Sequence, residues 1–236
     1  RILGDLEEAE QAIADDAGAL RGKLRLAAPL SFGLHHLGRA INGFLADHPG
    51  IELDLDLNDR QIDLVEEGFD MGIRIGDLPD STLIARRLGA ARFATCASPG
   101  YLAEHGEPKT PDELSGHVGL HYSNATLAEA WRFGGTDKEP ITAIPGIRLR
   151  ASNGDALAAA AMAGLGIVNL PTFIVADALR AGDLIAILQD YRRAPLGIHA
   201  LYPPGRLMPR RLRLFSDYLE GRFGDSPYWD DGLFHN

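Results

Sequence analysis

From Lys23 onward, stretches with the periodicity of strands alternate with stretches of helical periodicity, and this alternation constrains the fold more than any other feature. Segment 51–57 (IELDLDL) alternates apolar and polar residues, as a half-buried strand does. Segment 31–49 before it repeats apolar residues at the spacing of one helix face. Strands that alternate with helices form parallel sheets, because the chain must cross over between neighbouring strands. The sequence therefore predicts an α/β fold.

The rest of the chain divides into further predicted strands and helices by the same two periodicities, with turn and capping residues at the boundaries. Further strands are predicted at 23–29, 69–76, 83–89, 92–98, 118–123, 130–135, 141–152 and 196–204. Further helices are predicted at 60–68, 110–114, 171–184 and 209–223, and segment 152–171 predicts a helix followed by a short buried strand. No low-complexity linker interrupts the pattern, so we expect the joints between two lobes at the extended segments 93–98 and 195–201.

Residues 1–20 are predicted to form an amphipathic helix with apolar residues near a heptad seam and Asp16 as a polar interruption. An isolated helix of this length is marginal in water. We therefore expect it to pack on the body of the protein or on a second copy of the chain. The chain begins at Arg1 rather than at a methionine, and we expect further residues upstream.

Charge and composition exclude several classes of protein. The 236 residues carry a net charge of −10, which does not suit the wrapping of nucleic acid phosphates. The single cysteine, Cys96, excludes an internal disulfide and agrees with a reducing cytoplasm. No apolar run is long enough to span a bilayer, and the acidic first residues do not resemble a signal peptide.

No motif typical of catalysis, phosphate binding or metal binding is present. Nothing near Cys96 in the sequence lowers the pKa of its thiol, so a packing role is favoured over redox sensing. The pairs His35/His36 and His117/His121 lack a carboxylate or thiol at metal-ligand spacing. We expect no enzymatic activity, no cofactor and no metal.

Two predicted helix starts are candidate ligand contacts. Ser152 and Asp155 form an S-x-x-D pair at the start of one helix, and Ser31 is the predicted N-cap of another. Ligands of open α/β sheets lie beyond the carboxyl ends of strands, beside such helix N-termini. The alternative is that both serines only cap their helices.

Arg74 ends a predicted strand in the segment GIRIG and allows two interpretations. Its guanidinium suits the carboxylate of a ligand, and it equally suits a structural pair with Asp70 or Asp77.

A set of motifs in fixed order covers nearly the whole chain and resembles the effector-binding domain of LysR-type transcriptional regulators. The motifs are HP-x-I-x-L (48–53), DLVEEGFDMGIRIG (63–76), DSTLIARRL (80–88), ASPGYL (97–102), HGEPKTPDEL (105–114), SNGDALAAAAMAGLGIVNLP (152–171) and LYPPGRLMPRRLRLFSDYL (201–219). The chain looks most like the subgroup whose aromatic tail reads PYWD.

The resemblance implies a type 2 periplasmic-binding-protein-like fold, with two Rossmann-like lobes joined by two crossover strands and preceded by a linker helix. It implies a linker and dimerisation helix at 1–22, lobe I at 23–93 plus 199–224, lobe II at 94–198 and a C-terminal tail at 225–236. It also implies a homodimer or tetramer that contacts DNA only through a winged helix-turn-helix preceding these residues, with no membrane contact.

For such a domain we expect a small-molecule effector in the inter-lobe cleft, either a small acid or an aromatic compound. The acidic Asp155 at one helix start also allows a neutral ligand. The expected ligand-binding residues are Ser31, Phe32, Asn58, Arg74, Cys96, Ser152, Asn153 and His199.

Two other classes of protein remain as alternatives. A solute-binding protein of a transport system has the same two-lobed design, but an acidic heptad helix is the wrong lead-in for a secreted protein. An α/β enzyme using Cys96 or Asp155 would need a paired base or an oxyanion site, and the sequence indicates neither.

Overall fold

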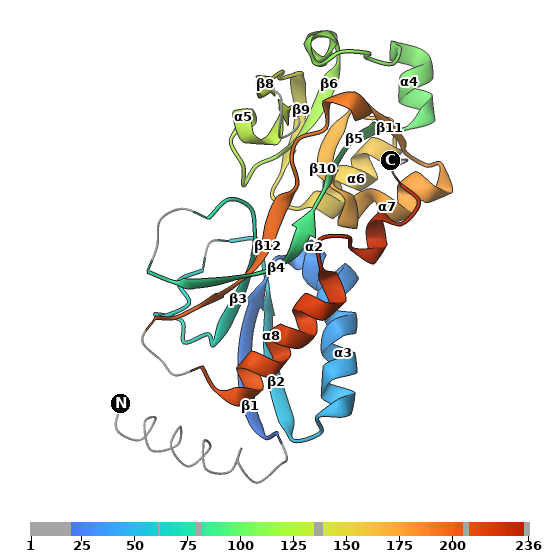
Figure 1. Ribbon diagram of the computed structural model, residues 1–236. Helices are drawn as coiled ribbons and strands as arrows, with labels where there is room; N and C mark the ends of the chain where they lie inside the picture. Colours follow the sequence, from blue (N-terminus) through green and yellow to red (C-terminus); the bar gives the residue numbers. More distant parts are fainter. Residues whose placement is uncertain (1–19, 61, 79–81, 135–138, 205–207, 234–236) are drawn as a thin grey trace. The chain divides into compact units, whose positions relative to one another are not determined.

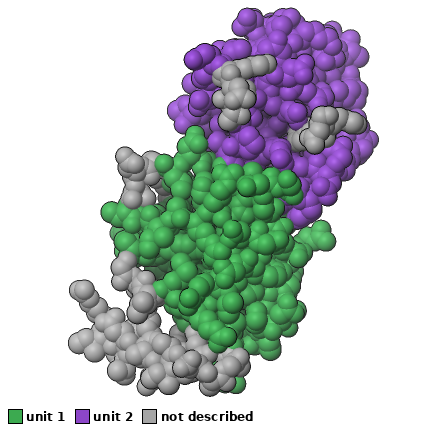
Figure 2. Space-filling view, in the orientation of Figure 1, with its two compact units in different colours: residues 1–90, 197–226 green, residues 91–196, 227–236 purple. Residues whose placement is uncertain are grey.

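The computed structural model describes residues 20–60, 62–78, 82–134, 139–204 and 208–233 (Figure 1). The predicted linker helix at 1–20 lies almost wholly outside the described residues. The chain divides into two compact units (Figure 2). Unit 1 comprises the described part of residues 1–90 together with Gly197–Ser226, and unit 2 comprises Ala91–Leu196 together with 227–236.

Unit 1 is built on a five-stranded sheet in the order β2-β1-β3-β12-β4. Strand β1 pairs in parallel with β2 and β3, whereas β12 runs antiparallel to β3. The strands are β1 (Gly22–Ala28), β2 (Ile51–Leu57), β3 (Met71–Ile75), β4 (Ile84–Ala91) and β12 (Leu196–Tyr202). The parallel pairing follows from the helix that connects β1 to β2, as the alternating pattern predicts.

The helices of unit 1 bury their apolar faces against this sheet. Residues 30–47 form one helical run, namely α2 (Leu30–Phe32), the π-helical η1 (Gly33–Leu37) and α3 (Gly38–Asp47). Helix α8 (Arg210–Phe223) lies beside α3 (Figure 1), and the rings of Phe44 and Phe215 meet there with centroids 4.8 Å apart. Both rings are almost fully buried, so this contact holds α3 and α8 side by side in one layer.

Unit 2 places β5 at the centre of a sheet in the order β10-β5-β11, both pairs being antiparallel, and β6 pairs in parallel with β9. The strands are β5 (Phe93–Ala97), β6 (Val118–Tyr122), β7 (Arg132–Phe133), β8 (Ile141–Thr142), β9 (Gly146–Ala151), β10 (Val168–Pro171) and β11 (Ile185–Ile187). The helices are α4 (Pro99–His105), η2 (Pro111–Gly116), α5 (Leu127–Ala130), α6 (Gly154–Met162), α7 (Thr172–Ala181), η3 (Gln189–Tyr191) and η4 (Tyr228–Asp230).

Successive residues of β5 point into two different apolar clusters. Ala94 and Cys96 pack with the buried faces of α6 and α7, whereas Ala97 packs with Trp131 on the other side. This alternation is the period of a strand whose two faces are both covered.

Three sequence predictions differ from the structure. The helix predicted at 60–68 is wrong, because the described part of this segment contains turns. Asp63 Oδ1 accepts from the backbone N–H groups of Val65 and Glu66, and such local bonds compete with a helix. The strand predicted at 130–135 is limited to β7 within the described residues, and that at 141–152 is divided into β8 and β9.

No helix in the described portion of the chain is both long enough and apolar enough to cross a bilayer.

Candidate functional site

Polar residues gather where the parallel strands of unit 1 end. Asn58 directly follows β2, and its backbone N–H donates to the carbonyl of Ala28, the last residue of β1, at 3.0 Å. Arg74 lies near the carboxyl end of β3. In open α/β sheets this edge is where ligands bind. Unit 1 therefore brings the neighbourhoods of Ser31, Asn58 and Arg74 to one edge of its sheet.

The start of helix α2 differs from the prediction. Its N-cap is Pro29, and Ser31 lies inside the helix with 5% of its surface exposed, so the predicted Ser31 cap is wrong. The backbone N–H of Leu30 instead donates to Asp59 Oδ1 at 3.0 Å. A carboxylate from a distant segment thus already occupies this positive helix end. Sequence reasoning missed Asp59, although its place two residues after a strand end was a usable signal.

Phe32 is fully buried in unit 1. Its ring makes an edge contact with Phe223, with centroids 5.2 Å apart, and a tilted contact with His36 at 5.9 Å. The side chain therefore anchors α2 to α8 rather than presenting an apolar wall to solvent.

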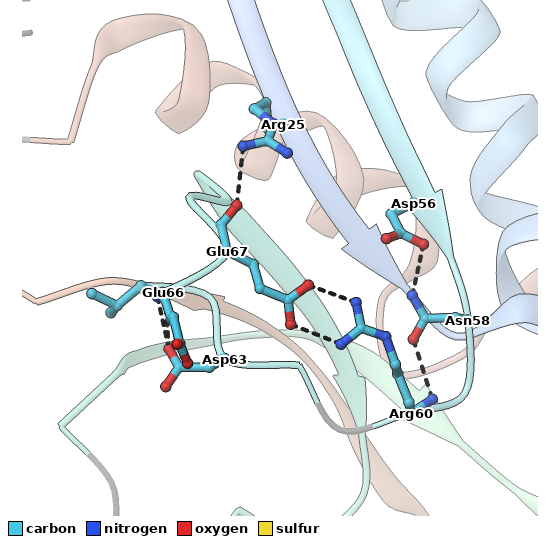
Figure 3. A network of polar contacts seen from close by, with 8 residues as sticks. Arg25, Asp56, Asn58, Arg60, Asp63, Glu66 and Glu67 are labelled. Carbon is cyan, nitrogen blue, oxygen red and sulfur yellow. Dashed lines mark hydrogen bonds and ion pairs between the residues drawn. The ribbon is translucent and has the colours of Figure 1, made fainter.

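Asn58 belongs to a polar network on the surface of unit 1 (Figure 3). Its Nδ2 donates to Asp56 Oδ1 at 2.6 Å, and its Oδ1 accepts from the Arg60 backbone N–H at 3.2 Å. Arg60 also forms a bidentate pair with Glu67, and its hydrogen bonds lower the pKa of the Glu67 carboxyl. Arg25 donates to the Glu67 carbonyl at 3.0 Å. The network fixes the orientation of Asn58 and of the loop that follows β2.

Arg74 is half-buried, and its guanidinium forms no hydrogen bond or ion pair among the described residues. Neither of the two structural partners considered for it forms an ion pair with it among the described residues. Asp70 Oδ2 accepts from the Arg25 backbone N–H at 2.8 Å, and Asp77 is exposed. The part of the chain that the structure describes therefore supplies no ion-pair partner for this guanidinium, although Asp77 lies near enough to His199 to exert a smaller, raising effect on the pKa of its imidazole.

His199 lies directly opposite Arg74 across the antiparallel pair of β12 and β3, so both side chains project from the same face of the sheet. Its Nδ1 is buried and has no hydrogen-bond partner in the described residues. Burial and the positive charge of Arg87 lower the pKa of the imidazole. The shift favours the neutral form of this imidazole, which lies beside the cation of Arg74.

Unit 2 presents a similar edge where β6 and β9 end and α6 begins. The N-cap of α6 is Asn153, whose Oδ1 accepts from the Ala156 N–H at 3.1 Å. The predicted Ser152/Asp155 cap is therefore wrong by one residue. Asn and Ser are comparable N-cap residues, so the sequence alone does not distinguish Ser152 from Asn153. Ser152 is exposed, and its carbonyl accepts from Asn124 Nδ2 at 3.3 Å.

Cys96 is fully buried, with Val168 and Ala186 as its register partners on the two flanking strands. Burial raises the pKa of its thiol to about 12. The side chain is part of the apolar core of unit 2, as the packing interpretation requires. No group of His, Cys, Asp or Glu side chains suited to a metal ion occurs within the described ranges.

Comparison with known proteins relates the chain to one group. The family profile described as "LysR substrate binding domain" matches residues 17–224. An HTH-type transcriptional regulator of Haemophilus influenzae is 39% identical over 211 residues, which cover 88% of this chain and 72% of the relative. The HTH-type transcriptional regulator YhjC of Escherichia coli is 36% identical over 227 residues, covering 93% of this chain and 74% of the relative.

A solved structure agrees with these relatives. The regulatory domain of CrgA, a LysR-type transcriptional regulator from Neisseria meningitidis, has a TM-score of 0.76 and 32% sequence identity to this chain. The match covers 87% of this chain and all of that domain. The likeness therefore extends over both units.

Proposed function

The chain belongs to the LysR family of transcriptional regulators, whose substrate-binding domain it contains, and on that premise we propose that it senses a small acid through Arg74. The fold is the two-lobed, type 2 periplasmic-binding-protein-like fold of that family. LysR-type regulators bind DNA and small-molecule effectors and form oligomers. The relatives are transcriptional regulators, which does not favour the solute-binding-protein alternative.

One observation carries the choice of ligand class: the guanidinium of Arg74 is half-buried and forms no ion pair among the described residues. Partial burial of an unpaired charge costs free energy that an opposite charge offsets. The planar guanidinium fork matches a carboxylate and binds it by charge-assisted hydrogen bonds. A ligand carboxylate is therefore the expected partner of Arg74.

The helix ends support this assignment by exclusion. The first N–H of α2 donates to the Asp59 carboxylate, and the start of α6 is capped by Asn153. Helix N-termini that already have an oxygen partner are weaker anion sites. We therefore assign the effector's negative charge to Arg74 rather than to either helix end.

The other predicted site residues divide by burial. Asn58, His199 and Ser152 have exposed or half-buried side chains, and we propose them as polar contacts supplied by their respective units. Ser31, Phe32 and Cys96 are buried, and Asn153 holds a helix start, so we propose that they shape the site without touching the effector.

We propose further that the chain acts by binding and not by catalysis, in the cytoplasm where its regulated DNA lies. The relatives are regulators, and the only thiol is buried with a raised pKa. The negative net charge supports contact with DNA through residues other than these 236.

Thermal-shift screening tests the ligand class. The panel contains aliphatic and aromatic carboxylates, with the matching amides and amines as controls. A ligand that binds only the native state at 100 times its dissociation constant stabilises the protein by about 2.7 kcal/mol. We expect carboxylates to raise the melting temperature while their amides do not. Stabilisation by amides or amines alone would contradict the assignment.

A further inference from the structure

The chain passes between the two units three times, at residues 90–91, 196–197 and 226–227. The first passage leads from β4 into β5, and the second leads into β12. The third leads from the end of α8 into residues 227–233, which we call the strap. Two passages are expected for the fold, so the third needs its own explanation.

The strap is docked on unit 2 by one buried ring and one arginine. Trp229 is 2% exposed, and its ring makes an edge contact with Phe173 of α7, with centroids 6.3 Å apart. Arg180, also on α7, donates to the carbonyls of Trp229 at 2.7 Å and Asp231 at 3.1 Å. Figure 1 shows this last described segment, in dark red, beside α7.

An ion pair ties the strap to the first passage. Asp230 Oδ2 accepts from Arg92 Nη1 at 2.8 Å, and Arg92 lies between β4 and β5. The Asp230 side chain is 7% exposed, and its Oδ1 has no hydrogen-bond partner in the described residues. The bond to Arg92 therefore offsets part of the cost of burying this carboxylate, and the charge of Arg192 also acts on it.

A second tie joins the same two segments within unit 1. The Gly224 N–H donates to the Leu88 carbonyl at 3.1 Å, and the Gly224 carbonyl accepts from the Ala90 N–H, also at 3.1 Å. The end of α8 is thus fixed to the end of β4. Only Asp225 and Ser226 separate Gly224 from the strap, and a fully extended chain of three steps spans about 11 Å at most.

From these contacts we propose that the first passage and the strap together form a doubled hinge, tied at both ends, which restricts the rotation of one unit relative to the other. A single extended passage can twist about a few backbone dihedral angles. Two passages joined by hydrogen bonds in unit 1 and by an ion pair in unit 2 must move together. Release of the strap leaves the first passage free to twist.

Distance distributions between spin labels test the proposal on the complete 236-residue chain. Val65→Cys in unit 1 and Ala103→Cys in unit 2 provide exposed label sites. The native thiol is fully buried and should escape labelling. Dilution with unlabelled chain restricts the signal to pairs within one molecule.

The strap variants are Asp230→Asn, which removes the charge paired with Arg92, and Arg180→Ala, which removes the donor to the strap carbonyls. Arg180 is 39% exposed, so its loss leaves the core of unit 2 intact. Asp231→Asn is the matched control, because Asp231 offers only its carbonyl to Arg180 and its side chain is exposed. Hydrogen–deuterium exchange of peptide 225–233 reports whether the strap is released.

In both strap variants we expect this peptide to exchange at least tenfold faster than in the parent chain, and the distance distribution to become broader. We expect neither change in Asp231→Asn. Faster exchange with an unchanged distribution would overturn the proposal, because the strap would then only stabilise unit 2. Unchanged exchange in both strap variants would also overturn it, because these contacts would not be what holds the strap.

Discussion

Replacement of Gly89 by alanine tests the tie between β4 and α8 by introducing a single methyl group. A Cβ at this position would lie closer than 3.0 Å to the Gly224 carbonyl oxygen and 3.2 Å from the backbone carbon and nitrogen of the same residue. All three atoms are backbone, so no side chain can rotate away. Either β4 or the end of α8 has to move.

The cost has two sources, the crowding itself and the weakening of nearby hydrogen bonds. Overpacking costs about 1–3 kcal/mol, and each of the two hydrogen bonds that join Gly224 to β4 contributes about 0.5–1.5 kcal/mol. Because the shift that relieves the clash also weakens the hydrogen bonds, the two costs are partly alternatives. We expect Gly89→Ala to lower the free energy of unfolding by about 2–4 kcal/mol.

Urea unfolding followed by far-ultraviolet circular dichroism measures the effect, with Gly221→Ala as the matched control. Gly221 lies in α8, and a Cβ there would meet nothing within 4 Å. Alanine at this helical position should stabilise by about 0.5–1 kcal/mol. Equal midpoints for Gly89→Ala and the parent, or shifts of the same sign in both variants, would refute the reasoning.

Three further predictions concern the titratable groups and a helix cap. Because the pKa of Cys96 is raised to about 12, its thiol should react with a disulfide reagent at pH 8 at least 100-fold more slowly in the folded chain than in urea. Burial lowers the pKa of His117 and of His199, so the unfolded chain binds more protons than the folded chain below about pH 6.5. The melting temperature should therefore fall when the pH is lowered from about 7.5 to about 5.5. It should fall less in a variant that carries both His117→Gln and His199→Gln. Asn153→Ala should lower the free energy of unfolding by about 1 kcal/mol in thermal unfolding, because it removes the N-cap of α6. An equal loss in Ser152→Ala would contradict the assignment of the cap to Asn153.

The fold could be predicted where periodicity is local. The alternation in IELDLDL gives the bounds of β2 correctly, and the helix expected at 171–184 ends where Gly182 adopts a left-handed conformation with φ of 81°. The helix expected at 60–68 failed because the pairing of Asp63 with backbone N–H groups nearby is invisible to a periodicity argument. Side-chain competition for the backbone, rather than hydrophobic pattern, determines that segment.

The candidate site was less predictable because its contacts join distant segments. Arg74 was recognised as a candidate from its place at a strand end, but its lack of an ion pair depends on distant contacts, such as the bond from the Arg25 backbone N–H to Asp70. The Ser31 cap failed because Asp59 arrives from the end of another strand. The position of His199 opposite Arg74 depends on the pairing of β12 with β3, which no local pattern specifies.

Calorimetric titration of the most strongly stabilising carboxylate tests the central claim, that this regulatory domain binds its effector through Arg74. The titration compares the parent chain with Arg74→Ala and with Arg213→Ala, which removes the same charge from an exposed position of α8 in the same unit. Loss of a charge-assisted hydrogen bond costs about 1.5–3 kcal/mol, so Arg74→Ala should weaken binding about 10- to 150-fold. Arg213→Ala should bind like the parent. Unchanged affinity in a folded Arg74→Ala variant would contradict the account.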